Sequence, residues 1–238
     1  MRDYSAGMRV VVTGANRGIG LELVCQLHAR GDTVEACARR PADADALGRL
    51  AGDRVRLHAV DVTDPEAVRG LAGALEGAAI DCLYNVAGSY GGSTQSLGQM
   101  ADALALPDVA ATYDINAMGP LRMTLALLPH VRRGQAKRLV HVTSGMGSIA
   151  DNTSGGYYAY RMSKAALDMM SKSLAVDLAG EGIISVVINP GWVQTDMGGA
   201  RAPTTVEDSV RGILRETDAV TVADSGSFLN WKGGRLPW

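Results

Sequence analysis

The chain lacks the features of disulfide-stabilised, metal-binding and membrane-spanning proteins. Its three cysteines are an odd number without Cys-x-x-Cys spacing, and its four histidines are scattered without metal-ligand spacing. These patterns favour free, buried thiols and predict no metal site. No apolar run approaches the roughly 18 residues of a membrane span, and residues 1–7 do not resemble a signal peptide. We therefore expect a soluble, cytoplasmic protein that does not bind membranes.

An excess of charge of one sign is also missing. The net charge is −2 and charged residues make up 20% of the chain, so nothing favours a nucleic-acid partner or an anionic membrane surface. Phenylalanine occurs once, so aliphatic and methionine side chains must fill the core. Glycine, by contrast, is abundant at 29 residues, which fits many tight turns. A length of 238 residues with 47% hydrophobic residues suits one sizeable α/β domain.

Short β-branched runs alternate with helical segments along most of the chain. Strands are expected near residues 8–13, 33–38, 55–60, 80–85, 138–143, 183–189 and 227–229. Helices are expected near residues 20–30, 42–50, 63–76, 109–132 with Pro120 as a candidate kink, 158–179 and 204–215. The alternation predicts an α/β, doubly wound Rossmann fold with a largely parallel seven-stranded sheet and helices on both faces. Without a linker or repeat, residues 1–238 are expected to form a single domain, with a substrate loop at about residues 191–217.

The first expected strand runs into a glycine-rich turn, Gly14-Ala15-Asn16-Arg17-Gly18-Ile19-Gly20, which opens a helix. A strand, a glycine turn and a helix start gather backbone N–H groups and the positive end of the helix at one point. This arrangement suits a pyrophosphate. The spacing is Gly-x-x-x-Gly-x-Gly, and its place directly after the first strand favours a dinucleotide site.

The second expected strand ends at Ala38-Arg39-Arg40, where a carboxylate would bind the ribose 2′-hydroxyl of NAD. No carboxylate stands there, and Arg17 in the glycine turn adds another cation. Guanidinium groups suit a 2′-phosphate. The arginines predict a preference for NADP(H) over NAD(H); the alternative is that they are solvated loop charges.

Tyr160 and Lys164 are four residues apart on the expected helix 158–179, which places the phenol and the ammonium on one face. A cation about 5 Å from a phenol favours the phenolate, by roughly two pKa units at an effective dielectric near 20. The spacing therefore predicts that the pKa of Tyr160 is shifted toward neutrality, where it can exchange protons with a substrate oxygen. Such a pair also arises by chance on any helix.

Taken together, the motifs resemble the short-chain dehydrogenases/reductases. The resemblance covers nearly the whole chain and rests on the glycine turn, Asp61, Asn85-Val86-Ala87-Gly88, Asn116, Ser144, Tyr160-x-x-x-Lys164 and Pro190-Gly191. The segments 146–149, 160–164 and 190–199 look like the C-factor and sniffer-like carbonyl reductase group. One departure is Val86, where the family usually has a second asparagine.

The resemblance implies a catalytic set and a cofactor set. Tyr160 would be the proton donor or acceptor, Ser144 would hold the substrate oxygen, Lys164 would bind the nicotinamide ribose and lower the tyrosine pKa, and Asn116 would anchor a water. Asp61 would hydrogen-bond the adenine. The cofactor set comprises Gly14, Asn16, Arg17, Gly18, Ile19, Gly20, Arg39, Asp61, Val62, Asn85, Ala87, Gly88, Tyr160, Lys164, Pro190, Gly191, Val193 and Thr195.

The implied activity is NADP(H)-dependent reduction of a ketone or aldehyde, reversible as oxidation of an alcohol. The alternative is a nucleotide-binding signalling or sensor protein of the C-factor type with little or no turnover. Expected pocket walls are 89–95, 146–149, Trp192, Met197 and the tail with Trp231 and Trp238, a set that favours an apolar or aromatic carbonyl. Members of this family often pair through the helices near 109–132 and 158–179, so a homodimer or homotetramer is an open expectation.

Overall fold

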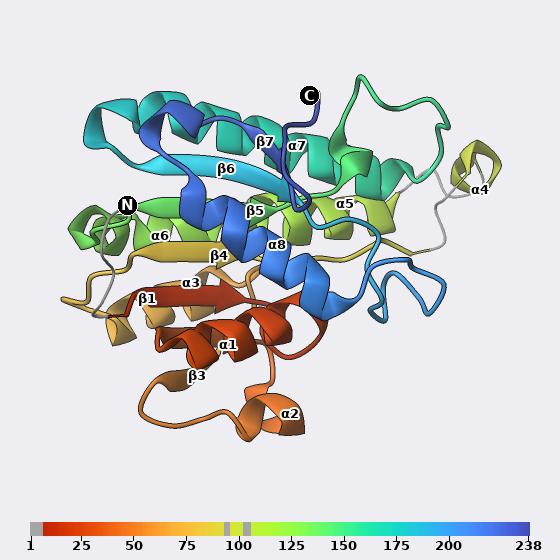
Figure 1. Ribbon diagram of the computed structural model, residues 1–238. Coiled ribbons are helices and arrows are strands. Elements are labelled where there is room, and N and C mark those ends of the chain that lie inside the picture. The colour runs from red at the N-terminus through yellow and green to blue at the C-terminus, as the bar shows by residue number, and fades with distance from the viewer. Residues whose placement is uncertain (1–6, 93–95, 102–105) are drawn as a thin grey trace.

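One parallel sheet of seven strands forms the centre of the computed structural model, which describes residues 7–92, 96–101 and 106–238 (Figure 1). The strand order is β3-β2-β1-β4-β5-β6-β7, and every neighbouring pair is parallel. The strands are β1 (Arg9–Thr13), β2 (Thr33–Ala38), β3 (Val55–Ala59), β4 (Cys82–Asn85), β5 (Arg138–Val142), β6 (Ile184–Asn189) and β7 (Phe228–Asn230). The prediction of a doubly wound α/β fold is confirmed.

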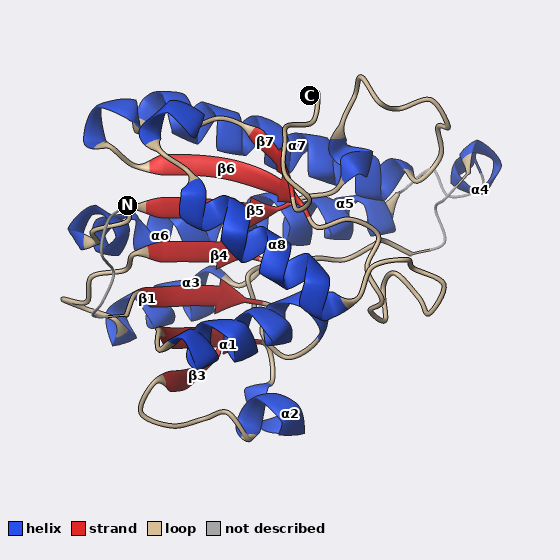
Figure 2. Cartoon of the chain, viewed as in Figure 1, coloured by secondary structure: helices blue, strands red, loops and turns tan. Residues whose placement is uncertain are grey.

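Helices cover both faces of this sheet (Figure 2). One face carries α1 (Gly18–Arg30) and α8 (Val206–Ala219), which pack against each other, and the opposite face carries α3 (Pro65–Ala74), α6 (Gly119–Arg133) and α7 (Tyr158–Asp177). Shorter helices are α2 (Asp45–Gly48), α4 (Leu97–Ala101) and α5 (Pro107–Tyr113). Single 3₁₀ turns occupy Pro41–Asp43, Gly145–Gly147, Ala179–Glu181 and Val222–Asp224.

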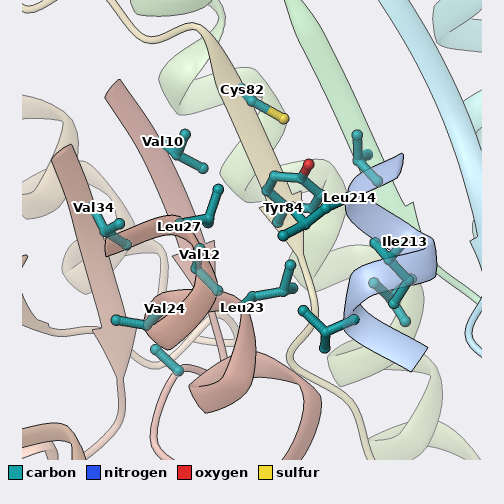
Figure 3. Close-up of a cluster of buried hydrophobic side chains, with 14 of the residues drawn as sticks. Val10, Val12, Leu23, Val24, Leu27, Val34, Cys82, Tyr84, Ile213 and Leu214 are labelled. Carbon is teal, nitrogen blue, oxygen red and sulfur yellow. The ribbon is translucent and has the colours of Figure 1, made fainter. Parts of the chain in front are cut away.

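Alternation of side chains along the strands divides the core into two layers. Val10 and Val12 of β1 point to one face, where Leu27 of α1 and Ile213 of α8 pack on them (Figure 3). Val11 points to the other face and joins the cluster under α3 and α6. All five side chains are completely buried. Both faces of β1 are thus apolar, as a parallel sheet covered by helices requires.

The order in which strands are added to the sheet reverses between β1 and β4. These two strands are neighbours although two strands separate them in the chain. At such a switch point the connections leave to opposite faces, and a crevice opens beyond the carboxyl ends of the strands. The glycine turn follows β1, the Asn85–Gly88 segment follows β4, Ser144 follows β5 and Pro190 follows β6. The topology therefore brings all four predicted motifs to one edge.

The predicted helix over residues 109–132 is present, and a π-helical turn interrupts its α-helical hydrogen bonding. Helix α5 ends at Tyr113, a π-helical turn covers Asp114–Met118, and α6 begins at Gly119. Pro120 lies directly after the π-helical turn, at the start of α6, where its missing N–H is tolerated. Two other helices also differ: the expected 42–50 helix shrinks to α2, and α8 extends to Ala219, so the expected loop 191–217 contains most of α8.

Candidate active site

The glycine turn after β1 brings the backbone of three segments together. Gly14 has φ +66°, and a methyl group there would lie 2.9 Å from the backbone of Ala87, which follows β4. A methyl group on Gly20 would overlap the carbonyl oxygen of Gly14. Only glycine fits these two positions, because the first turn of α1 packs directly on the end of β1.

A cavity of about 480 Å³ opens beside this turn. Arg17 and Gly18 line it on one side, and Gln194, Thr195 and Asp196 of the loop after β6 line it on the other. The second glycine of the turn's motif, Gly18, has φ +52°, and a methyl group there would lie 3.2 Å from Thr195. The start of α1 and the 191–205 loop therefore form a cradle for an anion, with N–H groups and the helix dipole directed at it.

The arginines predicted to bind a 2′-phosphate differ in their ion-pair partners. Arg17 forms an exposed ion pair with Asp196 at 2.9 Å, and Arg40 pairs with Asp43 at 3.3 Å. Arg39 is exposed and makes no ion pair with a described residue, yet it lies near enough to Asp61 to help lower the pKa of that carboxyl. Within the described part of the chain, Arg39 is therefore the guanidinium of this group without an ion-pair partner, and it could bind a phosphate.

Asp61 and Val62 follow β3 on the same edge of the sheet. One Asp61 oxygen accepts hydrogen bonds from the backbone N–H of Thr63 at 2.9 Å and from its hydroxyl at 2.7 Å. These bonds outweigh the effect of burial, so the pKa of Asp61 is lowered and the carboxylate is held ionised and fixed. Val62 is buried, and a methyl group on Gly119 would lie 2.7 Å from it.

Thr13 holds the segment after β4, although its role was not predicted. Its hydroxyl accepts hydrogen bonds from the N–H groups of Val86 at 2.9 Å and Ala87 at 3.1 Å. The side chain of Val86 packs on the apolar core. The turn is thus held by its backbone, which is why valine fits where the family usually has an asparagine. Asn85 itself is buried and contacts the His141 ring at 3.1 Å.

Asn116 lies in the π-helical turn and is completely buried. Its side-chain nitrogen donates to the carbonyl of Ser89 at 2.8 Å and to the hydroxyl of Ser163 at 2.9 Å, and its oxygen accepts from the Ser89 N–H at 2.7 Å. A methyl group on Gly88 would lie 3.3 Å from this oxygen and 3.9 Å from the Lys164 ammonium. In the π-helical turn, Asn116 therefore forms hydrogen bonds that link α7 to the segment after β4, although asparagine is otherwise unfavourable inside a helix.

Tyr160 and Lys164 share one buried face of α7, as predicted. Tyr160 is 8% exposed and Lys164 is 4% exposed, and the Lys164 ammonium lies 5.8 Å from the centre of the tyrosine ring. The ammonium donates a hydrogen bond to the carbonyl of Val142 at 2.8 Å. Burial lowers the pKa of Lys164 to about 8, an effect that the nearby Asp168 opposes.

The predicted direction of the tyrosine pKa shift is wrong. Burial raises the pKa of Tyr160 to about 12; a hydrogen bond with Ser144 opposes the rise, and Tyr90 and Asp168 add to it. Desolvation of the phenolate is the largest effect on this pKa, and the Lys164 ammonium is itself bound to the Val142 carbonyl. The phenol therefore keeps its proton throughout the neutral pH range.

Ser144 caps the turn Gly145–Gly147 at the end of β5, and its hydroxyl accepts from the N–H of Met146 at 3.1 Å. Asn189, which the sequence analysis did not single out, fixes this turn to the next loop. Its side-chain oxygen accepts from the N–H groups of both Gly145 and Gly191, each at 3.1 Å. The only signal in the sequence was a polar residue at the end of an apolar strand.

The loop after β6 holds the remaining predicted cofactor residues. The carbonyl of Pro190 accepts from the Ser209 hydroxyl at 2.7 Å, and Val193 is buried. A methyl group on Gly191, which has φ +84°, would overlap the Trp231 ring. Trp231 therefore supports this loop, whereas Trp238 packs on Phe228 with ring centres 5.5 Å apart. Of the expected pocket walls, residues 93–95 lie outside the described part of the chain.

Two further tyrosines surround Tyr160. The ring centre of Tyr90 lies 4.7 Å from that of Tyr160 and 5.6 Å from that of Tyr157. Tyr157 has φ +52°, a backbone conformation that costs a non-glycine residue about 1–2 kcal/mol. Tyr90 and Tyr157 are both partly exposed, so they present aromatic surface beside the phenol of Tyr160. Tyr90 was expected within the pocket wall 89–95, but its contact with Tyr160 of α7 was not predicted, because that contact is a long-range one.

The site thus gathers the predicted residues at the carboxyl edge of the sheet. Asn16 is exposed and Ile19 partly buried at the start of α1, while Gly88, Asn116, Ser144, Tyr160 and Lys164 lie together beyond β4 and β5. Chemically, this arrangement offers an anion cradle at one end and a phenol, a hydroxyl and an amine at the other. Among the described helices, none is both long and apolar enough to cross a membrane.

The chain is similar to known proteins in sequence and in overall structure. Residues 8–205 match the short chain dehydrogenase family. The C-signal of Myxococcus xanthus is 50% identical over 159 residues, which cover 67% of this chain and 93% of C-signal. The carbonyl reductase Sniffer of D. melanogaster has a similar structure, with a TM-score of 0.89 at 29% identity over 98% of this chain and all of Sniffer. The NADPH-bound carbonyl reductase from chicken fatty liver gives a TM-score of 0.89 at 33% identity, over 98% of this chain and 99% of the reductase.

Proposed function

The chain belongs to the short-chain dehydrogenase/reductase family, and from this premise we propose that it is an NADPH-dependent carbonyl reductase. The observation that carries the proposal is the buried face of α7, where Tyr160 lies beside Ser144 and Lys164 at the carboxyl edge of the sheet. A protein that only bound the nucleotide would not need a buried phenol, hydroxyl and amine there. The expected substrate is a ketone or an aldehyde.

The residues at the other end fit NADP(H). The cradle between the start of α1 and the loop after β6 has the shape and the N–H groups that a pyrophosphate needs. Asp61 would accept a hydrogen bond from the adenine, and Arg39 would bind the 2′-phosphate. The bound cofactor supplies the hydride. The NADPH carried by the chicken-liver reductase of similar structure supports the same choice of nucleotide.

The protein's own part in the reaction is proton delivery and charge stabilisation. Tyr160 would donate its proton to the carbonyl oxygen, because a phenol with a pKa raised to about 12 stays protonated at neutral pH. Ser144 would donate a hydrogen bond to the same oxygen as negative charge develops on it. Lys164, held by the Val142 carbonyl, would hydrogen-bond the nicotinamide ribose. Asn116 would keep α7 aligned with the segment after β4.

Tyr90 and Tyr157 support an apolar or aromatic substrate. Their rings form a wall beside the Tyr160 phenol, at the place where the substituent of a carbonyl carbon must lie. Aromatic rings bury large apolar area and favour tilted or offset contacts with other rings. We therefore propose that aromatic ketones and aldehydes are preferred over small aliphatic ones.

A signalling or sensor role is the second candidate, and the 50% identity to C-signal favours it. The two proposals differ in turnover. Fluorescence titration of the purified protein with NADPH and with NADH measures binding, and loss of NADPH absorbance with a panel of ketones and aldehydes measures reduction. Tighter NADPH binding with turnover of aromatic carbonyls is the expected result. Tight binding without turnover on a broad panel would favour the sensor, and absence of binding by either nucleotide would contradict both.

A further inference from the structure

Asp168 is a buried carboxyl group that the proposed mechanism does not use. It lies on α7 one helical turn beyond Lys164, on the face that also carries Tyr160, and it is 3% exposed. Aspartate is an unfavourable residue inside a helix, and it is rarely buried without a partner. Its position next to the Tyr160–Lys164 pair therefore calls for an explanation.

The surroundings of Asp168 are closely fitted to the carboxyl group. A methyl group on Gly147 would lie 2.5 Å from a carboxyl oxygen and 3.1 Å from the β-carbon of Lys164. The turn that follows Ser144 thus packs directly over Asp168. The Thr143 hydroxyl faces the carboxyl and lowers its pKa, but neither group makes a hydrogen bond of good geometry with a described residue.

The charged neighbour of this carboxyl is Lys164. Burial raises the pKa of Asp168 to about 7, and both Thr143 and Lys164 oppose the rise. In return, Asp168 opposes the lowering of the Lys164 pKa, so each buried group favours the ionised form of the other. Asp168 also raises the pKa of Tyr160.

Other titratable groups around this pair are few. His141 of β5 lies near Lys164; its pKa is lowered to about 3 by burial and by the lysine, so it is neutral at working pH. Neither β6 nor the turn Gly145–Gly147 contains a titratable side chain. On the adjoining π-helical turn, Asp114 is bound to Arg122 at 2.7 Å. Among the described residues, Asp168 is the acidic group that acts on the Lys164 pKa, and its carboxylate is therefore the candidate counter-charge.

We propose that Asp168 is a positioning residue of the active site: its buried carboxylate keeps Lys164 charged and held against the Val142 carbonyl, beside Tyr160. For its kinetic consequence this inference rests on the proposed reductase function. Its electrostatic part does not depend on that function, because it concerns two buried side chains one helical turn apart on α7. Because the substitution Asp168→Asn keeps the shape and removes the charge, it separates the electrostatic role from packing.

The direct test is an NMR titration of the full-length protein with ¹³C-labelled lysine side chains. The chain has only four lysines, Lys137, Lys164, Lys172 and Lys232, and Lys164→Arg identifies the signal of interest. In the unmodified chain the Lys164 signal is expected to titrate near its pKa of about 8, with an inflection from Asp168 near its pKa of about 7. In Asp168→Asn the inflection disappears and the lysine pKa falls by roughly one to two units. Asp177→Asn, an exposed residue of the same helix, serves as the control and leaves the titration unchanged.

The kinetic test measures how the ionisation of Lys164 affects turnover. The ratio of wild-type to Asp168→Asn kcat is expected to grow about tenfold as the pH rises through the lysine titration, because the variant's Lys164 loses its proton earlier. Asp168→Ser is a second neutral variant in case Asp168→Asn does not fold. A Lys164 signal that titrates in one step in the wild type, or identically in wild type and variant, would overturn the proposal. If the wild type reduces no carbonyl, the proposed function fails while the NMR titration still decides the role of Asp168.

Discussion

The two ends of the site are formed by different parts of the residues, backbone at one end and side chains at the other. The nucleotide end consists of backbone and glycine: Gly14 and Gly20 leave no room for a methyl group, and its arginines are exposed. The catalytic end consists of side chains buried on α7, where Tyr160, Lys164 and Asp168 are each under a tenth exposed. One end therefore depends on shape, and the other depends on charges held away from water. Substitutions at the two ends should therefore impair the protein for different physical reasons: steric overlap at the nucleotide end, and loss of buried polar groups at the catalytic end.

The substitution Gly20→Ala should have the largest effect at the nucleotide end, because it acts on the backbone packing there. The new methyl group would overlap the Gly14 carbonyl, so α1 would have to move away from β1. We expect the free energy of unfolding to fall by about 1–3 kcal/mol and NADPH binding to be lost. Urea denaturation and nucleotide fluorescence measure the two effects.

Gly70→Ala is the matched control for this substitution. Gly70 lies within α3, and a methyl group there would meet nothing within 4 Å. Replacing a helical glycine by alanine in open space should raise stability by roughly 0.5–1 kcal/mol. If Gly20→Ala were as stable as the wild type, the close packing of α1 on β1 would not require glycine at position 20.

Arg39→Ala should have an intermediate effect, because it removes a charge from the otherwise shape-dependent end. Loss of a charge-assisted hydrogen bond to a 2′-phosphate costs about 1.5–3 kcal/mol, so NADPH affinity should fall by roughly 10- to 100-fold while NADH affinity stays unchanged. Arg40→Ala is the control, because Arg40 already pairs with Asp43. If Arg40→Ala weakened NADPH binding more than Arg39→Ala, the assignment of the two arginines would be reversed.

Tyr90→Leu should have the smallest effect, because it changes only the wall beside the catalytic phenol. An aromatic contact contributes about 0.5–1.5 kcal/mol beyond its buried area, so kcat/KM for an aromatic ketone should fall a few-fold relative to an aliphatic one. Tyr90→Phe keeps the ring and should keep the preference. Equal losses for aromatic and aliphatic substrates would place Tyr90 outside the substrate wall.

The difference between the two ends also explains what could be predicted from the sequence. Glycine spacing and the Tyr160–Lys164 spacing are local patterns, and strand alternation places both at one edge of a parallel sheet. The glycine turn, the doubly wound parallel sheet and the shared face of α7 were therefore predictable. The identity of the fold follows from the same local periodicity.

What could not be predicted depends on burial and on long-range contact. The direction of the Tyr160 pKa shift is opposite to the prediction because desolvation of the phenolate outweighs the hydrogen bond with Ser144. The π-helical turn at Asn116 and the contact of Tyr90 with Tyr160 form only when distant segments pack. Asp168 was overlooked because a charged residue on a helix is usually solvated.

The most direct measurement is NADPH consumption with an aromatic ketone by the wild type, Tyr160→Phe and Tyr158→Phe, with NADPH affinity measured in parallel. General acid catalysis contributes about 10²- to 10⁴-fold, so Tyr160→Phe should lose at least that part of kcat while its NADPH affinity stays within about twofold. Tyr158→Phe, which keeps the catalytic phenol, should retain full activity. A Tyr160→Phe enzyme that kept more than about a tenth of the wild-type rate would contradict the central claim that the phenol on α7 delivers the proton.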